Sequence, residues 1–297
     1  MPESRGGATL LPASTGQATA ARNALWAALE ECGSAVVALS GGVDSATLAV
    51  LSHLALGDRS LAVTGVSASL SGHQKTLVES VLRAHPMPHE WLVTDELAFA
   101  DYLRNGPDRC FHCKNELYGR LRRLADARGI SAVLDGTNAD DTGDFRPGRL
   151  AAESCGVRSP LLEAGIGKEA VRALARELGL PVADEPASAC LASRVPRAIP
   201  IDAGILGRVE AGEEALRELG FSAFRVRHHG DLARIELPPT EIPRALSPEV
   251  GGRLADRLGE LGYRQVAVDL RGYRPAGLAT PFDPDRDLAF LSPGAGG

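Results

Sequence analysis

The feature that most constrains the fold is an apolar strand that ends in two glycines and passes directly into a helix. Residues 35–39 form the apolar run, Gly41 and Gly42 follow it, and leucines and alanines recur at helical spacing over 46–56. The two glycines therefore sit between a buried strand and a helix N-terminus. This order is typical of α/β domains, in which such a turn lies at the carboxyl end of a parallel strand.

The turn has the chemistry of a phosphate-binding loop. Gly41 and Gly42 permit positive φ and a close approach of the backbone to an anion, and the helix N-terminus offers free N–H groups and a positive dipole end. The hydroxyls of Ser40 and Ser45 add hydrogen bonds, and Asp44 is placed to help hold a metal beside the phosphates. A Walker loop would continue into Lys-Ser/Thr, which is missing here. An ordinary glycine turn is the alternative interpretation.

Strand-like and helical patterns alternate along the first two thirds of the chain. The strands are expected at 35–39, 61–67, 89–93 and 131–134, and the helices at 21–32, 46–56, 73–84, 114–128 and 168–179. This alternation predicts the α/β class, with a parallel sheet covered by helices on both faces. Ligands are then expected at the carboxyl ends of the strands.

A second region follows the proline-marked segment 181–200. Its pattern predicts a small α+β domain built from a helix at 205–219, paired strands at 223–228 and 232–237, a helix at 248–261 and a strand at 265–270. We therefore expect a nucleotide-binding domain over 19–194 and a small domain for substrate binding or oligomerisation over 195–274. Flexible tails are expected at 1–18 and 275–297.

Composition excludes several classes of function. The sequence has no apolar run of membrane-spanning length and no signal pattern, so we expect a soluble cytoplasmic protein. Five cysteines fit a reducing compartment, where thiols act as ligands or nucleophiles. The net charge of −6 and the scattered arginines argue against a nucleic-acid partner.

Three cysteines are candidates for chemistry. Cys110 and Cys113 form a C-x-x-C pair just before the predicted helix 114–128, which suits a redox dithiol, half of a zinc site or part of an iron–sulfur ligand set. A second metal-binding pair and a thioredoxin-like setting are both missing. Cys190 lies in a segment of small residues, with Arg194 close enough in sequence to lower a thiolate pKa or to grip a phosphate. The other two thiols, Cys32 and Cys155, are expected to be small buried hydrophobes.

Four further residues are candidates for ligand contacts. Gly136 and Thr137 follow a short apolar strand and are expected to face the nucleotide, with a polar turn as the alternative. Arg225 and Arg227 alternate along a predicted strand, so both point to one face and suit a phosphate monoester. A solvated edge strand is the alternative for this pair.

The hexapeptide Ser-Gly-Gly-Val-Asp-Ser at 40–45 resembles the pyrophosphate loop of the PP-loop ATP pyrophosphatases. Further motifs narrow the resemblance to the LarE family of sulfur transferases, which mature the nickel-pincer cofactor of lactate racemase. They are Arg-Cys-Phe-His-Cys-Lys at 109–114, Asp-Gly-Thr-Asn-Ala-Asp-Asp at 135–141, Arg-Ser-Pro-Leu at 158–161, Ala-Cys-Leu-Ala-Ser-Arg at 189–194 and a longer match at 225–236. The resemblance covers about residues 20 to 272.

The resemblance implies a reaction and its participants. ATP, with Mg²⁺, would adenylate a carboxylate of pyridinium-3,5-biscarboxylic acid mononucleotide, and a sulfur nucleophile would displace AMP to leave a thiocarboxylate. It further implies a supply of sulfide or another sulfur donor and a homo-oligomer such as a hexamer. The residues it assigns to ATP and pyrophosphate are Ser40, Gly41, Gly42, Asp44, Ser45, Gly136 and Thr137, and those assigned to the substrate phosphate are Arg194, Arg225 and Arg227.

Two routes for the sulfur stay open within the family. In one, Cys190 gives up its own sulfur and the protein is consumed. In the other, Cys110, Cys113 and Cys190 hold a [4Fe–4S] cluster whose fourth iron has no protein ligand and can carry an extra sulfide. Because all three cysteines are present, we favour the cluster.

Two other functions compete with this interpretation. A PP-loop tRNA thiolase would share the ATP and sulfur chemistry, but it should show a basic face that this acidic chain lacks. A nucleotide-sensing binding module would leave the three cysteines without a purpose.

Overall fold

The computed structural model describes residues 16–143, 147–186, 189–197 and 199–273. Almost all of the two predicted tails, 1–18 and 275–297, lies outside these ranges. The chain divides into two compact units, Met1–Gly212 and Glu213–Gly297. Each unit has a sheet of its own.

The first unit is built on a four-stranded parallel sheet in the order β3-β2-β1-β4. Its strands are β1 (Ala35–Ala38), β2 (Ser60–Val66), β3 (His89–Val93) and β4 (Ala132–Leu134). The register pairs Val36 with Leu61 on one side and Val133 on the other. The central strands are continuous apolar runs in the sequence because they are buried on both faces. The four predicted strands and the α/β class are confirmed.

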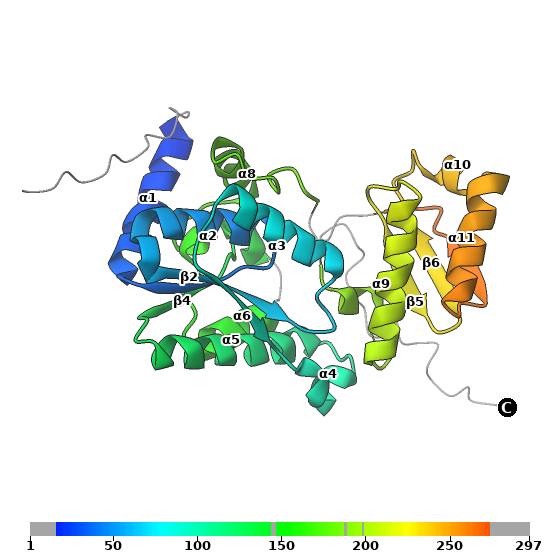
Figure 1. Ribbon diagram of the computed structural model, residues 1–297, viewed down its shortest axis with the longest axis horizontal. Coiled ribbons are helices and arrows are strands. Elements are labelled where there is room, and N and C mark those ends of the chain that lie inside the picture. Colours follow the sequence, from blue (N-terminus) through cyan, green and yellow to red (C-terminus); the bar gives the residue numbers. More distant parts are fainter. Residues whose placement is uncertain (1–15, 144–146, 187–188, 198, 274–297) are drawn as a thin grey trace, which may run out of the picture. The chain divides into compact units, whose positions relative to one another are not determined.

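Helices cover both faces of this sheet (Figure 1). On one face α1 (Gly16–Cys32), α2 (Val43–Leu56), α3 (Gly72–Ala84) and α8 (Lys168–Glu177) share an apolar core with the sheet. On the other face α5 (Arg109–Ala127) and α6 (Pro147–Ser154) pack against residues such as Val36, Val63 and Val133. The sheet is therefore the middle layer of three.

The helix α5 begins five residues earlier than the sequence pattern predicts. The prediction that Cys110 and Cys113 precede this helix is wrong, because both lie in its first turns. The buried positions of these turns carry Arg109 and the partly buried Cys113 rather than large aliphatic side chains. Hydrophobic periodicity could not reveal a helical face made of such residues.

Several shorter elements connect the main ones. They are η1 (Gly57–Arg59), η2 (Glu96–Ala98), α4 (Ala100–Leu103), η3 (Ala139–Gly143), α7 (Pro160–Glu163), η4 (Leu191–Arg194) and, in the second unit, α10 (Ile242–Ala245). Two of them, η2 and η4, place residues beside the cavity described below.

The second unit contains a three-stranded sheet in the order β5-β6-β7. The strands β5 (Arg225–His229) and β6 (Leu232–Glu236) are antiparallel, and β7 (Gln265–Val268) runs parallel to β6. The C-terminal end of α9 (Ala203–Glu218) and α11 (Pro248–Glu260) contribute to its apolar core, with Leu216, Leu254 and Leu258. The predicted small α+β arrangement is confirmed.

Candidate active site at the carboxyl end of the parallel sheet

A cavity of about 500 Å³ lies in the first unit, at the carboxyl ends of its central strands. It brings together nine of the residues singled out from the sequence, namely Ser40, Gly42, Asp44, Ser45, Cys110, Cys113, Gly136, Thr137 and Cys190. Gly41 and Arg194 do not line this cavity, and Arg225 and Arg227 belong to the second unit. The glycine turn and the three cysteines, far apart in sequence, thus share one site.

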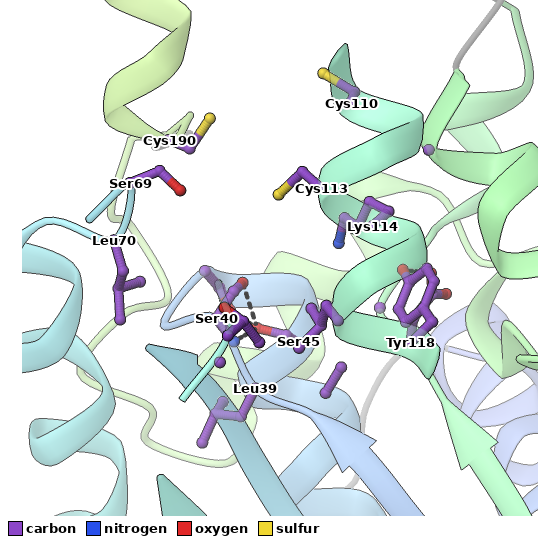
Figure 2. Close-up of a pocket in the computed structure, with 18 of the residues that line it drawn as sticks. Leu39, Ser40, Ser45, Ser69, Leu70, Cys110, Cys113, Lys114, Tyr118 and Cys190 are labelled. Atoms are coloured by element: carbon purple, nitrogen blue, oxygen red, sulfur yellow. Dashed lines mark hydrogen bonds between the residues drawn. The ribbon is translucent and has the colours of Figure 1, made fainter. Parts of the chain in front are cut away.

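The glycine turn is held in shape by its own serines. The Ser45 hydroxyl accepts a hydrogen bond from the Ser40 N–H (3.1 Å) and donates one to the Gly42 carbonyl (3.0 Å) (Figure 2). Gly42 is the N-cap of α2, and no side chain caps this helix end. The first amides of α2 therefore have no side-chain cap, which leaves this helix end suited to an anion, and the predicted phosphate contact stays a prediction.

Two glycines are required by close backbone contacts. Gly41 has a φ of +82°, and a Cβ there would lie 2.9 Å from the Gln74 carbonyl oxygen. A Cβ on Gly136 would lie 2.7 Å from the Ser45 nitrogen. The loop after β4 therefore packs backbone against backbone on the first turn of α2.

The Asp44 carboxylate has partners from two distant segments. Asn138 donates to Oδ1 (3.2 Å), and the Lys168 ammonium lies 2.5 Å from Oδ2. No lysine follows the glycine turn in the sequence, but Lys168, the first residue of α8, places its ammonium beside the turn. Sequence reasoning missed Lys168 because 124 residues separate it from Asp44.

Asp135, the residue after β4, lines the cavity and accepts several hydrogen bonds there. Its carboxylate accepts hydrogen bonds from Tyr118 (2.6 Å), Ser159 (2.7 Å) and both the N–H and the hydroxyl of Thr137. Thr137 therefore hydrogen-bonds to Asp135 and also lines the cavity. Tyr118 and Asp135 also hold the pKa of Lys114 above its usual value, against the opposite effect of burial.

Lys114 is the second lysine that sequence reasoning missed as a site residue. Its ammonium points from α5 into the cavity, toward the side where Ser40 and Ser45 lie (Figure 2). It lies 5.1 Å from the centroid of the Tyr118 ring. A fixed positive charge therefore faces the glycine turn.

The cysteines line the other end of the cavity. Figure 2 shows the sulfurs of Cys110 and Cys113 on the side of α5 that faces Cys190. Burial raises the pKa of the Cys113 thiol to about 12, and negative charge at Cys190 and Glu96 adds to this effect. Across the described residues, no group of three or more His, Cys, Asp or Glu side chains is gathered closely enough to hold a metal ion.

Arg109 ties the two cysteine segments together. This buried guanidinium donates to the Ala192 carbonyl (2.7 Å) and to Asn105 Oδ1 (2.8 Å). Burial alone would lower the pKa of Arg109, but the thiols of Cys190 and Cys110 raise it above its usual value. The start of α5 and the segment after Cys190 are thereby fixed to each other.

Arg194 is buried against its own segment. Its guanidinium donates to the carbonyl oxygens of Ala189 (2.5 Å) and Cys190 (3.0 Å) and to the Ser193 hydroxyl (3.0 Å). These contacts support the backbone that carries Cys190. Its predicted role toward a phosphate stays a prediction.

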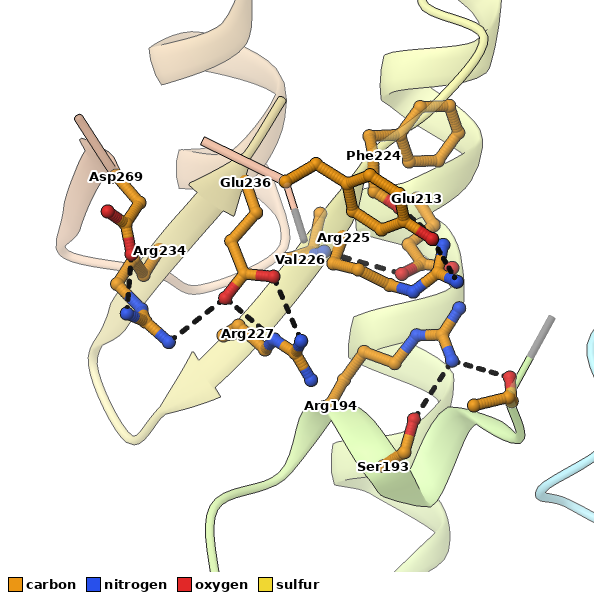
Figure 3. A network of polar contacts seen from close by, with 12 residues as sticks. Ser193, Arg194, Glu213, Phe224, Arg225, Val226, Arg227, Arg234, Glu236 and Asp269 are labelled. Carbon is orange, nitrogen blue, oxygen red and sulfur yellow. Dashed lines mark hydrogen bonds and ion pairs between the residues drawn. The ribbon is translucent and has the colours of Figure 1, made fainter. Parts of the chain in front are cut away.

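Arg225 and Arg227 lie at alternate, half-buried positions of β5, opposite the buried Val226 and His228. Arg227 forms a two-pronged ion pair with Glu236 (3.0 and 2.9 Å) (Figure 3). Arg225 donates to the Phe224 carbonyl (2.7 Å) and to the Tyr273 hydroxyl (3.1 Å). Both guanidiniums share one face of the strand and already have partners within the protein.

The remaining two cysteines, Cys32 and Cys155, differ in how deeply they are buried. Cys32 is buried, as expected, and donates to the Ala28 carbonyl (3.2 Å). Cys155 is only half-buried, so the expectation of a buried side chain is wrong for it; it follows the end of α6, with its sulfur 3.6 Å from Asn115 Oδ1. Neither lines the cavity.

In the part of the chain that the structure describes, none of the helices has the length and apolar character that crossing a membrane requires.

Comparisons with known proteins give three informative similarities, although no protein-family model matches the chain. The pyridinium-3,5-bisthiocarboxylic acid mononucleotide synthase of Lactiplantibacillus plantarum is 37% identical over 251 residues, which are 84% of this chain and 90% of that protein. The uncharacterized protein slr1717 of Synechocystis sp. is 41% identical over 244 residues, 82% of this chain and 91% of that protein. A component of the glutamine-hydrolyzing GMP synthase of Methanocaldococcus jannaschii is 31% identical over 160 residues, half of each chain.

Proposed function

Because the chain belongs to the LarE family of pyridinium-3,5-bisthiocarboxylic acid mononucleotide synthases, we propose that it thiolates pyridinium-3,5-biscarboxylic acid mononucleotide at the expense of ATP. The chain is an ATP-dependent sulfurtransferase of the PP-loop superfamily. The observation that carries the proposal is the single cavity shared by the glycine turn and three thiols. One end of it suits the activation of a carboxylate, and the other suits the delivery of sulfur.

Activation uses the turn at the start of α2. A carboxylate resists attack by a thiolate, and transfer of AMP to its oxygen turns that oxygen into a good leaving group. The uncapped amides of α2 and the ammonium of Lys114 would stabilise the charge that develops on the departing pyrophosphate. Mg²⁺ would add to this stabilisation, with Asp44 as its candidate ligand once Lys168 yields one carboxylate oxygen.

Sulfur delivery is assigned to the thiols at the other end. Cys110, Cys113 and Cys190 line one cavity and have the donor chemistry of an iron–sulfur site, so they are the residues that would hold a [4Fe–4S] cluster. When bound, such a cluster offers an iron without a protein ligand, which can bind an additional sulfide. Arg109 would then hold the α5 cysteines and the Cys190 segment in a fixed relation.

The alternative within the same reaction is that Cys190 donates its own sulfur. The half-buried Cys190 lines the cavity, so its sulfur is accessible to an activated substrate. A tRNA thiolase is the weaker alternative, because the net charge of −6 does not suit a polyanionic substrate.

The substrate phosphate is assigned to Arg194, Arg225 and Arg227. Guanidiniums suit a phosphate monoester because they bind it through paired hydrogen bonds. Binding would extend or replace contacts that these side chains now make with Glu236, Tyr273 and backbone carbonyls. We further propose that the protein works as a homo-oligomer, such as a hexamer, and that it draws on sulfide or another sulfur donor.

A pyrophosphate-release assay tests the substrate. Release should depend on the pyridinium dicarboxylate mononucleotide and should stay at the background rate with tRNA or with no acceptor. Stimulation by tRNA, or release without any preference among acceptors, would overturn the assignment.

Anaerobic purification followed by iron and sulfide analysis and Mössbauer spectroscopy tests the sulfur route. We expect a four-iron cluster that Cys110→Ala abolishes while ATP binding is kept. Cys155→Ala is the matched control, because this cysteine lies outside the cavity. An iron-free protein that transfers sulfur, with Cys190 converted to dehydroalanine by mass spectrometry, would establish the sacrificial route instead.

A further inference from the structure

One carboxylate of the cavity has hydroxyl partners instead of a cation. Glu96 is only 2% exposed, yet it lines the cavity at the end that holds Cys113 and Cys190. Ser67 donates to its Oε1 (2.5 Å), Ser69 donates to the same oxygen, and Thr94 donates to Oε2 (3.3 Å). These three hydroxyls belong to the segments that follow β2 and β3.

Two other carboxylates that line the cavity have a cation nearby. Asp44 is paired with Lys168, and Asp135 has Lys114 beside it. Glu116, on α5 outside the cavity, is paired with Arg120. Glu96 forms no ion pair within the described ranges of the chain, although a buried charge is costly when it is left without compensation.

The hydroxyls solvate the Glu96 charge without neutralising it. Each hydroxyl has a single proton, and when that proton is donated to Glu96 the lone pairs of the hydroxyl oxygen face away from the carboxylate. Ser67, Ser69, Thr94 and Glu96 all line the cavity. Together they form a wall of net negative charge, which we call the Glu96 wall.

The wall is fixed next to the sulfur end of the cavity. The Ser69 carbonyl accepts a hydrogen bond from the Leu191 N–H (3.1 Å), one residue after Cys190. Figure 2 shows the Ser69 side chain pointing into the cavity, below Cys190 and toward Cys113. A group bound against this wall is therefore presented to the thiols.

We propose that the Glu96 wall recognises the positive charge of the substrate's pyridinium ring. This inference rests on the proposed function, which supplies a ring whose nitrogen carries a permanent charge because the ribose is attached to it. An N-alkylated ring nitrogen has no proton to donate, so it is recognised by electrostatic contact with oxygens and not by a hydrogen bond. A buried carboxylate solvated by hydroxyls offers that contact, and it discriminates against a neutral ring of the same shape.

The test compares two ligands that differ in ring charge. Nicotinamide mononucleotide carries the cationic ring, and its reduced form carries a neutral ring with the same ribose, phosphate and amide. We expect the wild-type protein to bind the cationic form more tightly in equilibrium titrations. In Glu96→Gln the affinity for the cationic form should fall by about 10- to 100-fold, with little change for the neutral form.

Two variants separate recognition from a structural role. Glu96→Asp keeps the charge and should retain the preference for the cationic ring, so it also carries the test if Glu96→Gln does not fold. Glu116→Gln removes a carboxylate that already has a cation partner outside the cavity, and it should leave the preference unchanged. ATP affinity should be the same in all three.

The outcomes distinguish this inference from the proposed function. A folded Glu96→Gln protein that keeps the wild-type ratio of the two affinities, or a Glu96→Asp protein that loses it, overturns the inference. So does a wild-type protein without a preference for the cationic ring. The proposed function fails separately, if the wild-type protein releases no pyrophosphate with the pyridinium dicarboxylate.

Discussion

At the scale of single residues, Gly136 shows how tightly the cavity is built. Its Cα packs on the backbone at the start of α2, where any Cβ would come 2.7 Å from the Ser45 nitrogen. Backbone cannot move aside as a flexible side chain can. The shape of the glycine turn at 40–45 therefore depends on a glycine in another loop.

We predict that Gly136→Ala displaces the turn, weakens ATP binding by at least tenfold and destabilises the protein by about 1–3 kcal/mol. Isothermal titration with ATP and urea unfolding would measure the two effects. The matched control is Gly207→Ala in α9, where nothing lies within 4 Å of the added Cβ and alanine favours the helix. Equal behaviour of the two variants would contradict the close-contact argument.

Lys114 should act on the activation step. Replacing it by methionine removes the charge that faces the turn and keeps most of the apolar side chain. We predict that pyrophosphate release slows by about 10²–10³-fold, the usual cost of losing one charge-stabilising group at a reaction centre. Lys75→Met on α3, outside the cavity, is the control, and a similar loss there would point to a general charge effect.

Two buried tyrosines should respond oppositely to loss of their hydroxyls. The Tyr118 hydroxyl donates to Asp135 (2.6 Å), so Tyr118→Phe should cost about 1–3 kcal/mol of unfolding free energy. The Tyr102 hydroxyl is buried beside Ser69 and forms no hydrogen bond of ordinary geometry with the residues that the structure describes. Tyr102→Phe should therefore be neutral or stabilising. Urea unfolding of both variants checks the prediction, and a larger loss for Tyr102→Phe would contradict it.

At the scale of elements, α3 shows a helix start that local sequence specifies. The Ser71 hydroxyl accepts from the Gln74 N–H (3.2 Å), and Gln74 Oε1 accepts from the Ser71 N–H (3.3 Å), which is a capping box. We predict that Ser71→Ala costs about 1 kcal/mol of unfolding free energy. Ser80→Ala, in the middle of the same helix, should cost less, and the order of the two denaturation midpoints decides the point.

Elements with such local signals are the ones that sequence could predict. Apolar strands bounded by turns, and helices with aliphatic stripes, are placed within a few residues of their observed bounds. The start of α5 could not be predicted, because its buried face is made of Arg109 and Cys113, whose burial depends on contacts with the distant segment around Ala192.

The residues of the candidate site also differ in whether the sequence alone can identify them. The glycine turn and the cysteines have recognisable motifs, so sequence identifies them. Lys168 and the Glu96 wall have no sequence motif. Their place in the site depends on partners that are distant in the sequence and that the fold brings together.

At the scale of the whole molecule, each unit contains a histidine that is disfavoured in its charged form. Burial lowers the pKa of His89 in the first unit. In the second unit, partial burial and the nearby Arg234 lower the pKa of His229, but this residue is exposed, so solvent screening keeps its contribution small. The unfolded chain, with the ordinary value of 6.5, binds protons first as the pH falls. The stabilisation from both groups is therefore complete above pH 6.5 and is lost progressively below it.

We predict that the free energy of unfolding decreases between pH 7.5 and pH 5.5. Chemical denaturation at several pH values would measure it, and His89→Gln should make the dependence shallower. The lowered pKa of Asp108 acts only below its ordinary value of 3.8, outside this range. A flat profile would show that these histidines do not control stability.

The position of Cys110, Cys113 and Lys114 on one helix also limits how the sequence can change over time. An α-helix turns by about 100° per residue, so a single insertion or deletion between Cys110 and Lys114 would turn the Cys110 side chain out of the cavity relative to Lys114. A substitution elsewhere on α5 leaves this geometry unchanged, whereas a change in length between these residues alters it. This part of α5 should therefore keep its length in any descendant that keeps both Lys114 and the thiols in the cavity.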